Sequence, residues 1–208
     1  MLYLETVEPG TFQLLKDLMA APSVRDFSLV GGTCLSLRHG HRKSIDLDLF
    51  GTENFDNDTL KESLEQEGFR FTETFYTNRL GVFGFLNGIK VDFVRHHQYP
   101  MLRKIEVVDG IRMFSDQDIM AMKVSAILRR AVKKDFWDVA ELLRTYSMDD
   151  FVESYYAKYP DNILLISIPR ALSYFDDAEL SPEPECLRGL SWDEVKSIIR
   201  KAVREYLS

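Results

Sequence analysis

Two acidic side chains on one short segment are the residues of this sequence best suited to phosphate chemistry. Asp46 and Asp48 alternate with apolar residues, which is the periodicity of a β-strand. Residues two apart on a strand share a face, so the two carboxylates repel each other unless a cation lies between them. One or two carboxylates together with phosphate oxygens are a preferred ligand set of Mg²⁺. A half-exposed edge strand with two solvated aspartates is the alternative. The apolar residues expected to enter the core are Ile45, Leu47 and Leu49.

A glycine turn precedes these aspartates by twelve residues. Gly31, Gly32 and Thr33 lie between a short apolar strand at 27–30 and a helix that ends near His39. Glycine lets backbone N–H groups approach an anion closely, and a helix N-terminus adds positive potential. Thr33 is alternatively an ordinary helix N-cap. Beside an acidic strand, the turn predicts a triphosphate cradle next to a metal site.

A third carboxylate, Asp92, is expected on a hairpin over 80–94 whose turn is an Asn-Gly pair. In this hairpin Phe83 pairs with Asp92. If the strand lies beside the acidic strand, the three aspartates converge. Two metal ions held there could activate an attacking hydroxyl and neutralise a leaving pyrophosphate. Alternatively, Asp92 is an exposed strand residue beside Lys90.

A later pair of helices offers one lysine and two more carboxylates. Lys123 stands among apolar residues of a helix expected over 116–132, and Asp135 and Asp138 lie one turn apart in a helix expected over 135–146. The lysine could stabilise charge on a triphosphate, or its stem could simply cover apolar surface. The aspartates could orient Lys123, act in catalysis, or favour the start of their helix.

Three basic residues just before the acidic strand form an expected basic rim for nucleotide phosphates. They are Arg38, Arg42 and Lys43. A solvated loop is the alternative. The segment 40–44 lacks the glycine spacing of a P-loop.

The composition limits the class of protein. The chain has 208 residues, of which 45% are hydrophobic and 28% charged, as expected for a soluble globular protein with a core. Its apolar runs are too short to cross a membrane, and no secretory signal is expected. Cys34 and Cys186 are isolated thiols, which favours the reducing cytoplasm. A net charge of −7 excludes a basic DNA coat protein but permits a local basic pocket for a nucleotide or an RNA end.

The pattern predicts an α+β fold: residues 1–114 form a mixed β-sheet with flanking helices, and residues 115–208 form a helical C-terminal region packed on this core. The expected strands are 27–30, 45–50, 69–77, 80–86, 89–94 and a smaller pair within 104–114 with an Asp-Gly turn. The expected helices are 9–21, a short stretch after Gly31–Thr33 that ends near 39, and 56–67, 116–132, 135–146, 148–158, 162–176 and 192–206.

These motifs, in this order, resemble the AbiEii-type toxin family of nucleotidyltransferases. The resemblance rests on LVGGT, HRKSIDLDLF, KVDF and DIMAMK followed by KDFWD, and it covers roughly residues 27–145. These toxins of type IV toxin–antitoxin pairs belong to the DNA-polymerase-beta-like superfamily. The resemblance implies a mixed sheet with a metal site, and a helical C-terminal part that shapes a substrate cleft.

The resemblance also implies residue roles. Gly32 and Thr33 take the place of a phosphate-cradling Gly-Ser pair, and Asp92 matches the third superfamily carboxylate. Asp46 and Asp48 correspond to the metal ligands. The lysine and aspartate of the later motifs correspond to Lys123 and Asp138. The resulting catalytic set is Asp46, Asp48, Lys123 and Asp138, the metal set is Asp46, Asp48 and Asp92, and the triphosphate-binding set is Gly31, Gly32, Thr33, Lys43 and Ser44.

The leading hypothesis is a Mg²⁺-dependent enzyme that transfers a nucleotide from a nucleoside triphosphate to an RNA acceptor, namely the end of a tRNA. The enzyme is expected to act as a toxin that has a cognate antitoxin. One alternative is nucleotidylation of a small molecule or a protein, which the acidic surface favours. Another is a catalytically idle nucleotide-binding module, against which the intact Asp46, Asp48 and Lys123 argue.

Overall fold

The structure is a computed structural model that describes residues 1–72 and 75–208, and these residues form two compact units. Unit 1 comprises Met1–Arg38, Ser44–Tyr99 and Ile105–Phe114. Unit 2 comprises His39–Lys43, Pro100–Lys104 and Ser115–Ser208. The sequence places the two short segments 39–43 and 100–104 in the first region, whereas the structure groups them with the helices of unit 2.

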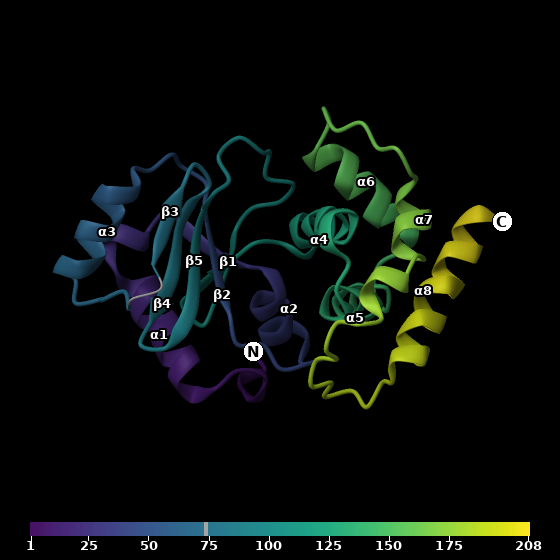
Figure 1. The fold of residues 1–208 in the computed structure, drawn as a ribbon, viewed down its shortest axis with the longest axis horizontal. Coiled ribbons are helices and arrows are strands. Elements are labelled where there is room, and N and C mark those ends of the chain that lie inside the picture. Colours follow the sequence, from purple (N-terminus) through teal and green to yellow (C-terminus); the bar gives the residue numbers. More distant parts are fainter. Residues whose placement is uncertain (73–74) are drawn as a thin grey trace. The chain divides into compact units, whose positions relative to one another are not determined.

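Unit 1 is built on a seven-stranded mixed sheet in the order β3-β4-β5-β2-β1-β7-β6. Figure 1 labels five of its strands, β1 to β5, in the N-terminal part of the chain. The strands are β1 (Phe27–Val30), β2 (Leu47–Gly51), β3 (Tyr76–Asn78), β4 (Gly81–Leu86), β5 (Ile89–Arg95), β6 (Glu106–Val108) and β7 (Ile111–Met113). This mixed sheet with helices around it confirms the predicted α+β fold class. Residues 73–74 of the strand expected at 69–77 lie outside the described residues.

Two hairpins of this sheet have the turns that the sequence predicts. Asn87 and Gly88 join β4 to β5 with φ values of 52° and 78°. Asp109 and Gly110 join β6 to β7 with φ values of 51° and 81°. Positive φ at both central residues is the requirement of a type I′ turn, which matches the twist of the strands. The β4–β5 register is the predicted one, with Phe83 opposite Asp92.

Three α-helices belong to the N-terminal half: α1 (Pro9–Ala20), α2 (Gly31–His39) and α3 (Asn57–Gln66). The apolar face of α1 is buried through Leu14, Leu15 and Leu18. The carboxylate of Asp56 accepts a hydrogen bond from the backbone N–H of Thr59 and thereby caps α3. Short 3₁₀ helices at Leu4–Thr6 and Pro22–Val24 flank α1.

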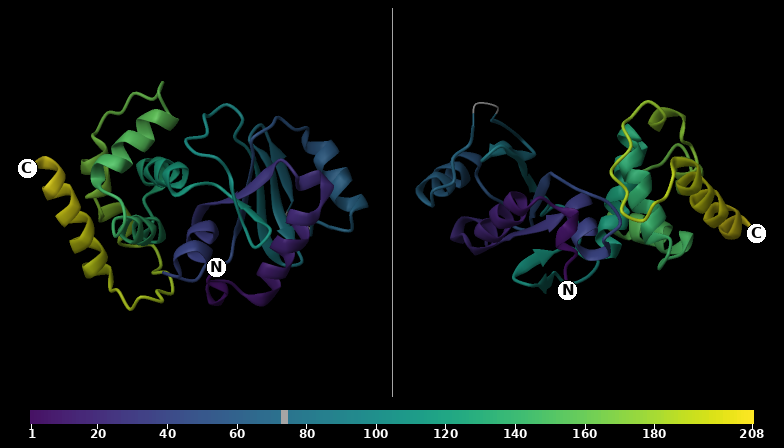
Figure 2. Two further views of the ribbon diagram at one scale, coloured as in Figure 1. Left: turned by 180° about the vertical axis from the view of Figure 1, so that it is seen from behind. Right: turned by 90° about the horizontal axis from the view of Figure 1, so that it is seen from below.

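Unit 2 is helical, and its helices α4 to α8 are drawn from two further sides in Figure 2. They are α4 (Asp116–Arg130), α5 (Lys133–Leu142), α6 (Met148–Lys158), α7 (Ile168–Leu172) and α8 (Trp192–Leu207), with a 3₁₀ turn at Asp176–Ala178. Serines at 115, 147 and 191 cap α4, α6 and α8. The stacked rings of Trp137 and Trp192, whose centroids are 5.4 Å apart, join α5 to α8.

A buried ion pair fixes the segment 100–104 within unit 2. Lys158 Nζ donates to Asp118 Oδ1 over 2.7 Å and to the carbonyl of Pro100 over 3.0 Å, and both charged side chains are fully buried. The backbone N–H of Leu102 donates to the same Asp118 carboxylate. One aspartate therefore joins α4, α6 and this connecting segment.

Two expectations about local structure were wrong. The helix expected over 162–176 is reduced to α7, Ile168–Leu172. Pro169 has no N–H and fits only the first turn of a helix, and the apolar side chains before it are exposed, so no packed face supports an earlier start. Ile45 is 66% exposed because β2 begins only at Leu47, and it does not enter the core. Among the described residues, no helix is both long enough and apolar enough to cross a bilayer.

Candidate active site

The aspartates at 48 and 92 lie side by side on two parallel strands. β2 pairs with β5 so that Asp48 is the direct partner of Asp92. Leu47 and Leu49 are fully buried on the opposite face of β2. Because side chains alternate along a strand, Asp48 and Asp92 share the other face. The predicted adjacency of the acidic strand and the hairpin is therefore confirmed, and Asp46 directly precedes β2.

Lys90 joins this group of carboxylates on the same face of β5. Its Nζ lies 2.8 Å from Asp92 Oδ2. Burial alone would lower the pKa of Lys90, but the hydrogen bond to Asp92 and the negative charges of Asp92, Asp46 and Asp48 outweigh burial and raise that pKa. The three aspartates and Lys90 thus form one electrostatic neighbourhood with a formal charge of about −2 at neutral pH.

This neighbourhood has the chemistry of a divalent cation site that is completed by substrate. Asp92 Oδ1 is buried and has no hydrogen-bond partner among the described residues. Residues 1–72 and 75–208 contain no preassembled group of three or more His, Cys, Asp or Glu side chains able to hold a metal ion. Mg²⁺ is commonly held by one or two carboxylates plus phosphate oxygens, so the donor set fits a cation that arrives with a triphosphate.

The glycine turn packs its backbone directly against Asp48. Gly31 begins α2 with a φ of 70°, a conformation that favours glycine. A Cβ atom at Gly31 would collide with Asp48 Oδ2. The N-terminal turn of α2, whose first N–H groups have no intrahelical acceptor, therefore begins beside the carboxylate of Asp48.

Thr33 connects this helix to the loop that carries Asp46. Its side chain is buried, and its hydroxyl donates to the carbonyl oxygen of Asp46. Ser44 Oγ lies 2.8 Å from the Thr33 hydroxyl. Because α2 already begins at Gly31, Thr33 is not the N-cap. The side chains of Thr33 and Ser44 therefore hold the loop that carries Asp46.

The basic rim expected before the acidic strand was wrong for its two arginines. Arg42 is 3% exposed, and its guanidinium makes two hydrogen bonds to Asp138. Arg38 donates to the carbonyl of Phe114 over 2.9 Å and pairs with Glu106. Both guanidinium groups are used inside the protein because they satisfy buried acceptors.

Asp138 is the centre of a buried ion cluster in unit 2. Arg42 Nε and Nη2 lie 2.7 and 2.8 Å from its two carboxylate oxygens, and His41 Nε2 lies 2.7 Å from Oδ1. Lys123 Nζ lies 2.5 Å from Asp138 Oδ2 and 2.8 Å from Asp135 Oδ1. The cluster joins the segment 39–43 to α4 and α5.

The charges in this cluster stabilise one another. Burial would raise the pKa of Asp138, but Arg42 and Lys123, with hydrogen bonds from His41 and Arg42, hold it well below its usual value. Burial would lower the pKa of Lys123, but the charges of Asp135 and Asp138 raise it. Both aspartates and both cations are therefore ionised at neutral pH.

The predicted site residues accordingly fall into two groups. Asp46, Asp48, Asp92, Gly31, Gly32, Thr33 and Ser44 belong to unit 1, and Lys43, Lys123 and Asp138 belong to unit 2. Lys123 and Asp138 contact each other, and Asp138 is fully buried. Lys43 is half-buried, and its backbone N–H donates to the carbonyl of Glu185.

Sequence reasoning missed two participants in these groups. It identifies Lys90 as a neighbour of Asp92 and not as a partner of all three aspartates, although its place two residues before Asp92 signals a shared face. It does not identify His41 as a partner of Asp138. No local pattern in the sequence connects these two residues, because they are 97 positions apart.

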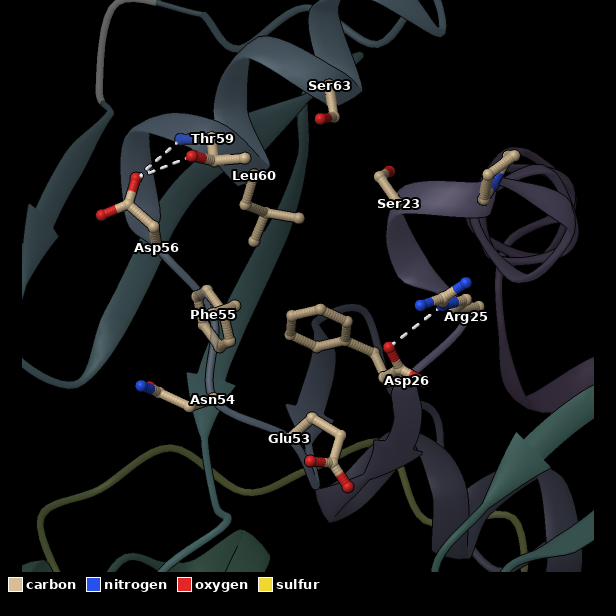
Figure 3. A pocket seen from close by; sticks show the side chains of 12 residues that line it. Ser23, Arg25, Asp26, Glu53, Asn54, Phe55, Asp56, Thr59, Leu60 and Ser63 are labelled. Atoms are coloured by element: carbon tan, nitrogen blue, oxygen red, sulfur yellow. Dashed lines mark hydrogen bonds and ion pairs between the residues drawn. The ribbon is translucent and has the colours of Figure 1, made fainter.

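A separate cavity of about 290 Å³ lies elsewhere in unit 1 (Figure 3). The rings of Phe27 and Phe55 and the side chain of Leu60 line it, together with the Arg25–Asp26 ion pair. Its lining includes residues 53–56, which follow β2, whereas Asp46 precedes β2. None of the predicted site residues lines this cavity.

Comparison with known proteins relates the fold and motifs to one family. The family described as "Nucleotidyl transferase AbiEii toxin, Type IV TA system" matches residues 13–185. The uncharacterized Aquifex aeolicus protein aq_aa25 is 32% identical over 200 residues, which cover 94% of this chain and 95% of that protein.

Two solved structures share the fold at low sequence identity. JHP933 from Helicobacter pylori is 13% identical with a TM-score of 0.54, over 94% of this chain and 91% of its own. MenT4, the nucleotidyltransferase toxin Rv2826c of Mycobacterium tuberculosis H37Rv, is 14% identical with a TM-score of 0.54, over 94% of this chain and 84% of its own. Since the family match spans most of the sequence, this protein belongs to the AbiEii nucleotidyltransferase toxin family of type IV toxin–antitoxin systems, and it is a nucleotidyltransferase.

Proposed function

We propose that the protein transfers a nucleotide from a nucleoside triphosphate to the end of a tRNA in a Mg²⁺-dependent reaction. We also propose that it acts as a toxin restrained by a cognate antitoxin. The observation that carries the proposal is the position of Asp48. It lies between the backbone of the Gly31 turn and its strand partner Asp92, and this proximity of two carboxylates to a helix start supports a metal site beside an anion-binding site. Membership of the toxin family supports both the triphosphate donor and the antitoxin.

Each unit 1 residue has a distinct part in this proposal. Asp46 and Asp48 hold Mg²⁺, which neutralises charge on the triphosphate when it is bound. The backbone N–H groups of Gly32 and Thr33 bind phosphate oxygens, and Gly31 lets the turn approach Asp48. Asp92 is proposed as the third carboxylate of this metal site, because its buried Oδ1 has no hydrogen-bond partner among the described residues.

The proposed transfer is a single displacement at phosphorus. A ribose hydroxyl oxygen of the RNA attacks the α-phosphorus of the triphosphate, and a new phosphorus–oxygen bond forms. The bond between the α-phosphorus and the oxygen bridging to the β-phosphate breaks, and pyrophosphate leaves with that electron pair. The hydroxyl proton passes to solvent. Fixed geometry and fixed charge supply most of the catalysis in this class of reaction.

The unit 2 residues enter the proposal as supporting groups. Asp138, with no exposed surface, acts by holding Arg42, His41 and Lys123. Through Arg42 it fixes the segment that leads within four residues to Asp46. Lys43 is the lysine proposed to bind phosphates, and Lys123 is proposed to act with Asp138 in this supporting role, which substitution of each lysine would test.

A labelling experiment tests the proposal. The protein is incubated with α-³²P-labelled triphosphates, Mg²⁺ and total RNA, and the products are separated by size. We expect label in a tRNA-sized band with the wild type. With Asp48→Asn we expect labelling to fall by at least about 100-fold, because loss of a residue that only supports a metal ligand already costs up to about that factor. The control is Asp109→Asn, the same chemical change at an exposed turn position of unit 1.

The same experiment separates the acceptors. Label in protein or in small molecules, with none in RNA, would replace the RNA acceptor with the alternative that the net charge of −7 favours. Absence of any label would favour an idle nucleotide-binding protein. Growth arrest on expression that Asp48→Asn relieves would support toxin action, and equal growth of both strains would contradict it.

A further inference from the structure

A row of side chains crosses four neighbouring strands on the face that carries the aspartates. The register pairs Asp48 of β2 with Asp92 of β5, and Asp92 with Phe83 of β4. It then pairs Phe83 with Tyr76 of β3. Directly paired residues of adjacent strands project to the same side of a sheet, so two aromatic rings continue the line begun by the two carboxylates.

The two rings at the end of this row form an accessible aromatic surface. Tyr76 and Phe83 stack with their centroids 5.0 Å apart and their planes 10° from parallel. Tyr76 is 57% exposed, and Phe83 and Phe85 are half-buried. The intervening Val82 and Leu86 are buried on the opposite face of β4. An exposed pair of stacked rings can receive a further flat ring.

The strand order places these rings on the acceptor side of the carboxylates. The sheet runs β3-β4-β5-β2-β1, so the glycine turn after β1 and the rings on β4 and β3 lie on opposite sides of the Asp48–Asp92 pair. In phosphoryl transfer the attacking and leaving oxygens are roughly in line. If pyrophosphate leaves at the glycine turn, the attacking hydroxyl arrives from the side of the rings.

The distance across the strands fits the end of a polynucleotide. Adjacent strands are about 4.8 Å apart, so Tyr76 lies roughly 10 Å from Asp92 across the sheet. Stacked nucleotides of one strand rise about 3.4 Å each, and the last two or three would span that distance. Base–aromatic stacking tolerates any base, because every base has a π-face.

We propose that the Tyr76–Phe83 pair is a stacking platform for an unpaired base near the end of the RNA acceptor. This inference rests on the proposed function for the direction in which the acceptor enters. It assigns the platform to the acceptor and not to the base of the incoming triphosphate, because the triphosphate is held at the opposite side of the aspartates.

A binding experiment distinguishes this role from simple stabilisation of the β3–β4 edge. Binding of a fluorescein-labelled single-stranded RNA hexamer with a free 3′-hydroxyl is measured by anisotropy. Tyr76→Ala and Tyr76→Leu should weaken binding by about 5- to 150-fold, the range for loss of one base stack. Tyr76→Phe should bind within about twofold of the wild type, since it keeps the ring.

Two controls make the measurement decisive. Tyr156→Ala removes a tyrosine of comparable exposure, 47%, from unit 2 and should leave binding unchanged. Tyr76→Leu keeps apolar bulk on the edge strand, so thermal unfolding near that of the wild type shows that the fold is intact. Wild-type binding by folded Tyr76→Leu, or no binding of the hexamer by the wild type, would overturn the proposal.

Steady-state kinetics then separate this proposal from the proposed function. With RNA as acceptor, Tyr76→Leu should raise the KM for RNA by the factor lost in binding and leave the KM for the triphosphate unchanged. A rise in the KM for the triphosphate alone would assign the rings to the donor base and overturn the platform. If hexamer binding depends on the rings but no nucleotide is transferred to RNA, the rings still bind an RNA base, and the proposed function with RNA as acceptor is refuted.

Discussion

Lys90 interacts with the same three carboxylates that a divalent cation would need, those of Asp46, Asp48 and Asp92. Its ammonium lies 2.8 Å from Asp92 Oδ2, and its pKa is raised by Asp92, Asp46 and Asp48 despite partial burial. A cation that binds these aspartates meets the field of Lys90 and displaces part of its ion pairing. If these aspartates hold Mg²⁺ as proposed, Lys90 should weaken binding of the ion by the protein alone, and it offsets carboxylate repulsion when the ion is absent.

Replacing Lys90 with methionine should strengthen binding of the metal ion. For Lys90→Met we expect Mn²⁺ or Mg²⁺ to bind about two- to fivefold more tightly in the absence of nucleotide, the effect of one partly exposed ion pair. Isothermal titration calorimetry measures this directly. Lys16→Met, the same change at an exposed position of α1, should leave the affinity unchanged. Weaker metal binding by Lys90→Met would show that Lys90 organises the carboxylates and does not compete with the cation.

Asp138 makes the stability of unit 2 depend on pH. Its folded-state pKa is well below the usual value of 3.8, so its contribution is fully present above about pH 4 and is lost as the pH falls through the folded-state pKa. The pKa of Lys123 is raised above 10.5, so its contribution is present below that pH and is lost as the pH rises through the folded-state pKa. The contributions of Asp138 and Lys123 are therefore both present from about pH 5 to about pH 9.

Substitution of Asp138 tests this cluster. Asp138→Asn leaves Arg42 and Lys123 with one fewer buried counter-charge, and we expect a loss of about 3–5 kcal/mol in the free energy of unfolding. Urea unfolding at pH 7 and pH 3 provides the measurement. The difference between variant and wild type should shrink at pH 3, since acid removes part of the same interaction. A loss below about 1 kcal/mol at pH 7 would show that the cluster is replaceable.

At the scale of elements, the turn between β1 and α2 tolerates little change. Gly31 combines a φ of 70° with a position where a Cβ would strike Asp48 Oδ2. An alanine there costs about 1–2 kcal/mol of backbone strain and displaces the carboxylate. Displacement of a reacting group by about 1 Å lowers rates by about 100-fold, so we expect Gly31→Ala to lose transfer activity to about that extent.

Gly10 provides the matched control for this substitution. It lies in α1, and no neighbouring atom of the described residues is within 4 Å of the position that a Cβ on Gly10 would take. Gly10→Ala should therefore keep full activity and gain up to about 1 kcal/mol in stability. Activity is measured by the labelling assay and stability by urea unfolding. Full activity of Gly31→Ala would mean that Asp48 moves freely, which would weaken its assignment as a metal ligand.

The hairpins and most helices of this fold follow from local patterns in the sequence. The Asn87–Gly88 turn fixes the β4–β5 register because two residues with positive φ allow only one pairing of the flanking strands. The parallel pairing of β2 with β5 depends on tertiary structure and has no local signal in the sequence. From the sequence it could be stated only as the condition under which the three aspartates would converge. The helix expected over 162–176 forms only at Ile168–Leu172. The segment has the apolar periodicity of a helix, but its first apolar side chains are exposed, and periodicity stabilises a helix only when the apolar face is buried.

The candidate site shows the same division. The spacing of Asp46 and Asp48 and the position of Asp92 in the hairpin are local features, and the sequence correctly places Asp48 and Asp92 on one face. The partners of Asp138 are not local, because Arg42 lies 96 residues away. Burial of a charged side chain requires a partner, but the sequence does not say which of its 26 lysines and arginines that partner is.

For the whole molecule, net charge limits how RNA can be held. The chain carries −7, and several arginines bind its own backbone or carboxylates. The three guanidinium nitrogens of Arg112 each donate to a carbonyl, those of Phe27, Met19 and Val24, and Arg95 donates to the carbonyl of Phe55. Under the proposed function, the net charge of −7 therefore favours RNA contacts that salt does not screen over many contacts with phosphates.

Binding of RNA should therefore depend weakly on salt. For single strands the slope of log K against log salt concentration is about −0.7 for each phosphate neutralised, and with three contacts or fewer we expect a slope no steeper than about −2. Anisotropy of a 20-nucleotide RNA from about 50 to 300 mM KCl measures it. Tyr76→Leu should lower affinity at every salt concentration without changing the slope, because stacking releases no counterions. A slope steeper than about −4 would show a basic surface that binds the phosphate backbone, and the stacking platform would then be a minor contributor.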